Sequence, residues 1–151
     1  MTFLKTSLAA FAIAIAQPAF AADTIVIKDA YARFLPGAKA GAAFMVIENL
    51  APEADRLVGA SSDVAMRVEL HTHQAGEGGM MQMLHVPEGF AIPGAGEHNL
   101  ARGGDHVMMM GPTRSIVSGD TLTLTLSFEN AGDLVVEVPV DNARADMAPT
   151  N

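Results

Sequence analysis

The segment 121–128 constrains the fold most, because apolar and polar side chains alternate along it without a break. Its apolar members lie two residues apart: Leu122, Leu124, Leu126 and Phe128. Successive side chains of a β-strand point to opposite faces, so this alternation predicts a strand with one buried face and one solvated face.

Short segments of similar character recur along the chain, separated by Gly, Pro, Asp and Asn. Turn signals about every 8 to 12 residues, with no long amphipathic helix, predict an all-β sandwich or barrel. The pattern shows no internal repeat and no domain linker, so we expect a single domain. The strands are expected at residues 24–32, 42–49, 56–61, 65–73, 80–86, 106–110, 121–128 and 134–140, with a short strand at 97–101 inside a loop of residues 87–105.

The first 22 residues read as a secretory signal peptide. Lys5 precedes an apolar run, Leu8 to Ala16, and Ala19-Phe20-Ala21 fits an A-x-A cleavage pattern. The run is shorter than the roughly 20 residues of a membrane-spanning helix. We therefore expect an exported, periplasmic protein without a membrane anchor after signal removal, with a folded domain at 23–140 and a flexible tail at 141–151.

Charge and composition exclude several classes of function. Without the signal, eight basic residues face seventeen acidic ones, a net charge of −9. Such a surface repels phosphate backbones, so nucleic-acid binding is not expected. The chain contains no cysteine, which excludes disulfides, thiolate zinc sites, iron–sulfur clusters and a blue-copper centre.

Histidines and methionines share the faces of three predicted strands. Residues two apart on a strand point the same way, which gives three candidate rows of metal ligands. Imidazole with thioether suits copper, and Cu(I) above all, because thioether sulfur is a soft donor. The rows are His71 with His73, Met81 with Met83 and His85, and His106 with Met108 and Met110.

Some of these residue types have a simpler interpretation. Methionine is a flexible, apolar core residue, and we expect Met45 and Met66 to be no more than that. In the run 108–110, Met109 has the opposite phase to its neighbours and is the expected core member. His98, in the loop without a soft neighbour, is expected to be solvated.

The ordered series His71…Met83…His106-x-Met108, preceded by Gly103-Gly104-Asp105, resembles the signature of the periplasmic PCu(A)C-type copper chaperones. That signature is a His, ten residues, a Met, twenty-one residues, then His-x-Met. Each interval is one residue longer here, and the extra residues fit in the turn 75–79 and the loop 87–105, where insertion leaves strand register intact. Similar stretches lie at 29–33, 41–44 and 68–71, so the resemblance covers about residues 24 to 140.

The resemblance implies a cupredoxin-like β-sandwich of Greek-key type that carries one Cu(I) on His71, Met83, His106 and Met108. His73, Met81, His85 and Met110 remain as auxiliary ligands, and the choice between His71 and His73 is open. The histidines also allow Cu(II). The implied function is a metallochaperone that delivers copper to a recipient protein, either a cytochrome c oxidase subunit during assembly of its copper centre or another copper chaperone.

Three alternatives stay open. A periplasmic copper-storage or copper-resistance carrier would use the same ligands. A non-metal β-sandwich interaction domain would not bind metal in a fixed ratio. A zinc hydrolase would need a His/carboxylate set, and Glu69 beside His71 is the one hint of it. The chain has no nucleophile elbow, Walker loop or dinucleotide fingerprint, so we do not expect an enzyme.

Overall fold

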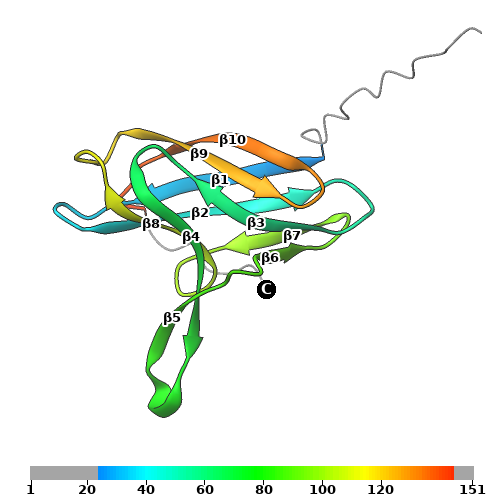
Figure 1. Cartoon of the computed structure of the whole chain (residues 1–151), viewed down its shortest axis with the longest axis horizontal. Helices are drawn as coiled ribbons and strands as arrows, with labels where there is room; N and C mark the ends of the chain where they lie inside the picture. The colour runs from blue at the N-terminus through cyan, green and yellow to red at the C-terminus, as the bar shows by residue number, and fades with distance from the viewer. Residues whose placement is uncertain (1–23, 145–151) are drawn as a thin grey trace, which may run out of the picture.

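The computed structural model describes residues 24–144 and forms two packed antiparallel sheets (Figure 1). The first sheet has the strand order β1-β2-β8-β4-β5, and β7 pairs with the part of β2 that does not pair with β8. The second sheet has the order β10-β9-β3-β6. This confirms the predicted sandwich. The strands are β1 (Ile25–Arg33), β2 (Ala40–Asn49), β3 (Asp55–Ser61), β4 (Ala65–Ala75), β5 (Met81–His85), β6 (Phe90–Ile92), β7 (Gly96–Leu100), β8 (His106–Pro112), β9 (Thr121–Phe128) and β10 (Gly132–Pro139).

The core lies between the two sheets and follows the period-two pattern. The four apolar residues of β9 are buried there, as predicted from their spacing. From the first sheet, Val107, Met109 and Met45 point inward and are almost fully buried. The core assignments of Met45 and Met109 are therefore confirmed.

The core assignment of Met66 is wrong, because its side chain is 82% exposed. Met66 has the inward phase of Val68 and Leu70, but it stands near the beginning of β4. Its side chain lies over Gly111, where an added Cβ would come within 2.6 Å of Met66 Cε. The alternation of side chains between the two faces of β4 therefore does not by itself determine burial at this end of the strand.

The β4–β5 hairpin projects from the sandwich (Figure 1). β4 pairs with β8 from Ala65 to His71 and with β5 from His71 to Ala75, so its second half extends beyond β8. Its turn contains a short 3₁₀ segment, Glu77–Gly79, in which Gly78 and Gly79 adopt φ of 75° and 76°. All five residues of β5 are exposed, so the predicted ligands on this strand lie at the surface.

Two expectations about loops need adjustment. The loop 87–105 contains β6 as well as the expected strand near 97–101; β6 was missed because it is only three residues long. Near the C-terminal end of the described residues, the Asn142 side chain donates to the Phe34 carbonyl at 2.7 Å and accepts from the Phe34 backbone N–H at 2.9 Å. Residues 141–144 thus contact β1 and the segment after it, while the rest of the predicted tail and the signal segment 1–22 lie outside the described residues.

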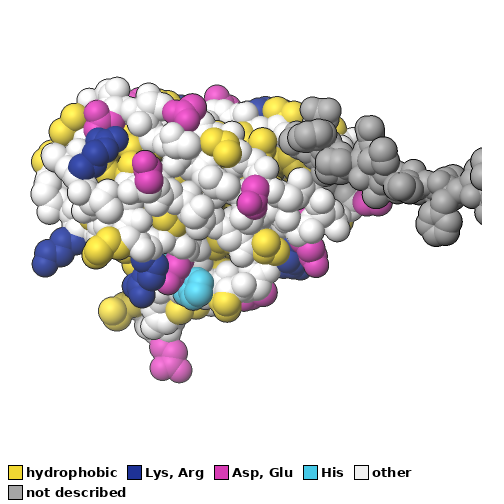
Figure 2. All heavy atoms as spheres, turned by 45° about the horizontal axis from the view of Figure 1, so that its top comes forward, with side chains coloured by type: hydrophobic (Ala, Val, Ile, Leu, Met, Phe, Trp, Pro, Cys, Tyr) yellow, Lys and Arg dark blue, Asp and Glu magenta, His cyan; other side chains and the backbone are white. Residues whose placement is uncertain are grey.

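Charged side chains of both signs are scattered over the face shown in Figure 2, without a broad patch of one sign. Between residues 24 and 144, no helix is long and apolar enough to cross a lipid bilayer.

Candidate metal centre

Strand register brings the three predicted ligand rows together on the outer face of the first sheet. β4 lies between β5 and β8, so its outward side chains have neighbours on both sides. The directly opposed pairs are His71 with His85 and His106, His73 with Met83, Ala75 with Met81, Glu69 with Met108, and Arg67 with Met110. The inward residues between them, such as Leu70 and Val107, belong to the core. The ligand rows therefore form one cluster across three strands.

His106 is the most buried member of the cluster, at 1% exposure. Its Nδ1 lies 3.0 Å from the Gly104 carbonyl oxygen. A carbonyl can only accept, so Nδ1 carries the hydrogen and, in the neutral ring, Nε2 keeps its lone pair. Burial lowers the pKa of His106, although the Gly104 hydrogen bond opposes the shift. The site thus favours the neutral imidazole that a metal needs.

His71 is oriented by a carboxylate. Its Nε2 lies 2.9 Å from Glu69 Oε2, and the hydrogen bond from His71 is the largest cause that lowers the pKa of Glu69. The ionised carboxylate only accepts, so the hydrogen is on Nε2 and the lone pair of the neutral ring is on Nδ1. That Nδ1 is buried and finds no hydrogen-bond partner among the described residues.

His73 has the same property, since its buried Nδ1 also lacks a hydrogen-bond partner within residues 24–144. Its ring stacks on that of His106, with 5.1 Å between centroids, whereas the His71 and His106 centroids are 6.0 Å apart. The His73 backbone N–H donates to the Gly104 carbonyl at 3.2 Å. Buried imidazole nitrogens without partners are uncommon, and two of them occur in this one cluster.

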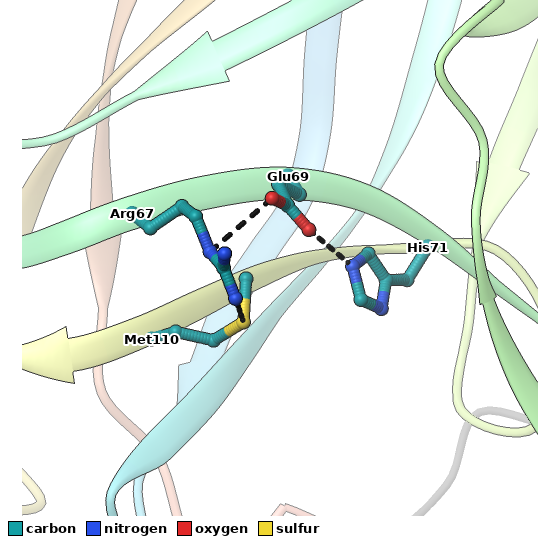
Figure 3. A network of polar contacts seen from close by, with 4 residues as sticks. All are labelled: Arg67, Glu69, His71 and Met110. Atoms are coloured by element: carbon teal, nitrogen blue, oxygen red, sulfur yellow. Dashed lines mark hydrogen bonds and ion pairs between the residues drawn. The ribbon is translucent and has the colours of Figure 1, made fainter.

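The methionines of the cluster differ in their exposure to solvent and in whether the sulfur atom has a polar contact. Met83 is 44% exposed and Met81 58% exposed, both on β5. Met108 is half-buried on β8. Met110 is engaged, because Arg67 Nη2 lies 3.4 Å from its Sδ (Figure 3).

A groove of about 650 Å³ opens beside the cluster. Of the predicted ligands, His73, His106, Met81, Met83 and Met108 line it. Its remaining wall is mostly small and apolar, with two arginines at the side: Arg33, Leu35, Ala38, Ala40, Gly41, Ala42, Phe44, Arg102 and Gly103. The groove gives a small ligand or a partner's side chain access to these donors.

The donor chemistry of the cluster is soft. Among residues 24–144, no group of three or more His, Cys, Asp or Glu side chains is placed to hold a metal ion. Histidines and methionines do share the face and the groove there, and the combination of imidazole nitrogen with thioether sulfur suits Cu(I). The residues present therefore fit copper as cargo.

A family model described as "Putative lipoprotein LpqE-like" matches residues 25–140. The chain belongs to the LpqE-like family. "Putative lipoprotein Lxx21020" of Leifsonia xyli subsp. xyli is 32% identical to it over 123 residues, which is 82% of this chain and 73% of that relative. The lipoprotein names of this family indicate an exported protein.

Solved structures of copper-binding domains are similar to this LpqE-like chain. The copper-bound PCuAC domain from PmoF2 has a TM-score of 0.64 and 24% identity, and the match covers 78% of this chain and 92% of that domain. The solution structure of CuI-DR1885 from Deinococcus radiodurans has a TM-score of 0.61 and 32% identity, covering 86% of this chain and 83% of that one. The predicted cupredoxin-like β-sandwich is confirmed, and the structural neighbours include the PCuAC domains that the sequence resembles.

Sequence reasoning missed two contributors to the centre, the Gly104 carbonyl and the Arg67 side chain, which both contact the cluster. His98 was expected to be solvated, but its Nε2 lies 2.8 Å from Asp105 Oδ2 and its ring stacks on Phe90, so these contacts lie outside the cluster. The Glu69-x-His71 spacing was the available signal for the carboxylate, since residues two apart on a strand share a face.

Proposed function

We propose that this LpqE-like protein is a periplasmic Cu(I) metallochaperone, not an enzyme. The observation that carries the proposal is the meeting of lone-pair-bearing imidazoles and thioethers on one sheet face. The proposed ligands are His71 through Nδ1, His106 through Nε2, and the sulfur atoms of Met83 and Met108. Thioethers need no deprotonation, so they bind copper without competition from protons.

His71 is proposed as the second imidazole because of its partner. Histidines that hold metals usually donate their other ring N–H to a carboxylate or carbonyl. Both His71, with Glu69, and His106, with Gly104, have that arrangement. His73 lines the groove and, with Met81, is proposed as an auxiliary ligand that copper meets during entry or exit.

The position of the ligands supports transfer as well as binding. Met83 comes from the exposed β5 strand, whereas His106 is buried in the sheet. An incoming ligand can displace the exposed thioether first, and the buried imidazole last. Stepwise replacement of this kind releases copper to a partner without leaving the ion free in solution.

The first experiment is an anaerobic Cu(I) titration of the protein against a chromophoric Cu(I) chelator. We expect one copper per chain, and an affinity loss above about 100-fold for His106→Ala, since even outer-shell changes cost 10- to 100-fold. Met83→Ala should weaken binding in the same assay. Met66→Ala is the matched control, because Met66 is exposed and lies on the core-phase side of β4. Equal losses in all three variants, or no binding by the wild type, contradict the proposal.

His71→Ala and His73→Ala decide which imidazole is the primary ligand. Loss of the one-copper end point in His71→Ala, with a smaller effect in His73→Ala, supports the proposed set. The reverse result assigns the role to His73.

A Cu(II) form is a second candidate for the same cluster, which contains four neighbouring imidazoles. No three of these rings are placed to hold one ion among the described residues, so Cu(II) binding would require side-chain rotation. The His71 and His85 rings are 5.7 Å apart between centroids, and His106 and His73 adjoin them. Cu(II) prefers nitrogen donors in a tetragonal arrangement. Electron paramagnetic resonance of a stoichiometric Cu(II) complex with nitrogen hyperfine structure tests this; several weak sites count against it.

Delivery to cytochrome c oxidase is the proposed biological role. A strain without the gene should lose oxidase activity when copper is scarce, and the wild-type gene should restore it while the His106→Ala gene does not. Loss of tolerance to excess copper, with normal oxidase activity, would instead identify a storage or resistance carrier.

A further inference from the structure

A chain of three side chains runs along the outer face of β4 (Figure 3). Glu69 lies between Arg67 and His71, each two residues away, so all three share a face. Arg67 Nε lies 3.2 Å from Glu69 Oε1, and His71 Nε2 lies 2.9 Å from Glu69 Oε2. Each carboxylate oxygen therefore has its own partner.

The geometry fixes where the hydrogen of His71 resides. A neutral imidazole carries one N–H, and the two nitrogens compete for it. Glu69 offers an acceptor at Nε2, while the buried Nδ1 has no partner among the described residues. The hydrogen is therefore held on Nε2, and the lone pair is left on Nδ1.

We propose that Glu69 is a positioning residue that holds His71 in the Nε2–H tautomer, so that Nδ1 is presented to copper. The inference rests on the proposed copper-binding function and adds a residue to it. Glu69 does not touch the copper; it acts through His71. Its exposed side-chain fraction is 22% and that of His71 is 13%, so water competes only weakly for this hydrogen bond.

Arg67 completes the arrangement in two ways. It holds the second carboxylate oxygen, which restricts the rotation of Glu69. Its Nη2 also contacts Met110 Sδ at 3.4 Å, which occupies one of the two sulfur lone pairs. Met110 is thereby connected to this network, and it stays outside the four proposed copper ligands. Because the Arg67 side chain is 67% exposed, we expect its removal to matter less than that of Glu69.

The first test needs no copper. The ring ¹⁵N shifts of His71, measured by NMR at one fixed pH, report which nitrogen carries the hydrogen. We expect the Nε2–H form in the wild type, a mixture of tautomers in Glu69→Ala, and recovery of the Nε2–H form in Glu69→Gln, whose amide oxygen can accept the same bond. Glu48→Ala is the control, because Glu48 is a partly exposed carboxylate of the same sheet that pairs with Lys28. An unchanged His71 tautomer in Glu69→Ala overturns the inference.

The second test measures Cu(I) affinity in a double-mutant cycle. Glu69→Ala should weaken binding about 10- to 100-fold in the wild-type background and have little further effect when His71 is already alanine. Equal losses in both backgrounds, or no loss in either, overturn the positioning role. If the wild type binds no Cu(I), the proposed function and the role of Glu69 toward copper are both overturned. The NMR experiment is independent of copper and reports separately whether Glu69 sets the His71 tautomer.

Discussion

Replacing Met109 by alanine should destabilise the fold without removing the proposed copper site. Met109 lies between two methionines of the outer face, yet its own side chain is fully buried in the core. The substitution deletes three heavy atoms, worth about 2.4 kcal/mol at ~0.8 kcal/mol for each buried methylene-sized group. The cavity left behind raises the loss of unfolding free energy to about 3 to 4 kcal/mol, within the range for Met→Ala in cores.

Urea unfolding of the copper-free protein measures this loss. With a slope of about 1 to 3 kcal/mol per molar urea, the midpoint should fall by roughly 1 to 4 M at unchanged slope. Met66→Ala is the matched control, and at 82% exposure it should change stability by less than about 0.5 kcal/mol. In the folded Met109→Ala protein, Cu(I) should still bind one to one. A loss below about 1 kcal/mol for Met109→Ala, or an equal loss for Met66→Ala, would refute the core assignment.

Three further predictions concern the stability of the fold. Asp55 is buried and accepts three backbone N–H bonds, so Asp55→Ala should lower the unfolding free energy by about 2 to 4 kcal/mol in urea titrations, with unchanged Cu(I) affinity. The backbone N–H of Val117 lowers the pKa of Asp120, so the stability that this carboxylate provides is present above its unfolded pKa and lost as pH falls through the lower folded pKa. Asp120→Asn should therefore lose less stability than the wild type between about pH 5 and about pH 2 in denaturation series; a steeper loss contradicts the sign. Gly41→Ala places a Cβ 2.5 Å from Phe34 Cδ1 and 2.6 Å from the Arg33 carbonyl oxygen, so it should cost about 1 to 3 kcal/mol. A neutral result would show that both the ring and the backbone can shift.

Much of this fold followed from the strand period. The alternation in 121–128 predicted both the strand and its buried face, because a sandwich buries one side of each sheet. The same period placed Met109 in the core and put Met108 on the opposite face with His106. The His/Met rows were therefore found from sequence, although each was found separately.

The assembly of the rows depends on pairing, which the sequence does not specify. His71 lies opposite His106 on β8 and opposite His85 on β5. These contacts depend on which strands are neighbours and on the register of their pairing. Those choices arise from long-range packing. Burial at the ends of strands also depends on long-range packing. Met66 is on the face of β4 that points to the core, but no other layer of the described residues covers it there.

The Gly104 carbonyl joins the backbone of β4 at His73 to the ring of His106 on β8. One oxygen atom in a loop thus determines both the direction of the His106 lone pair and the attachment of the hairpin's base to that loop. A change of loop length or conformation near Gly104 should alter the proposed copper centre, even though the loop contributes none of the proposed ligands. We therefore expect substitutions in that loop of this chain to change Cu(I) affinity while every proposed donor atom stays the same.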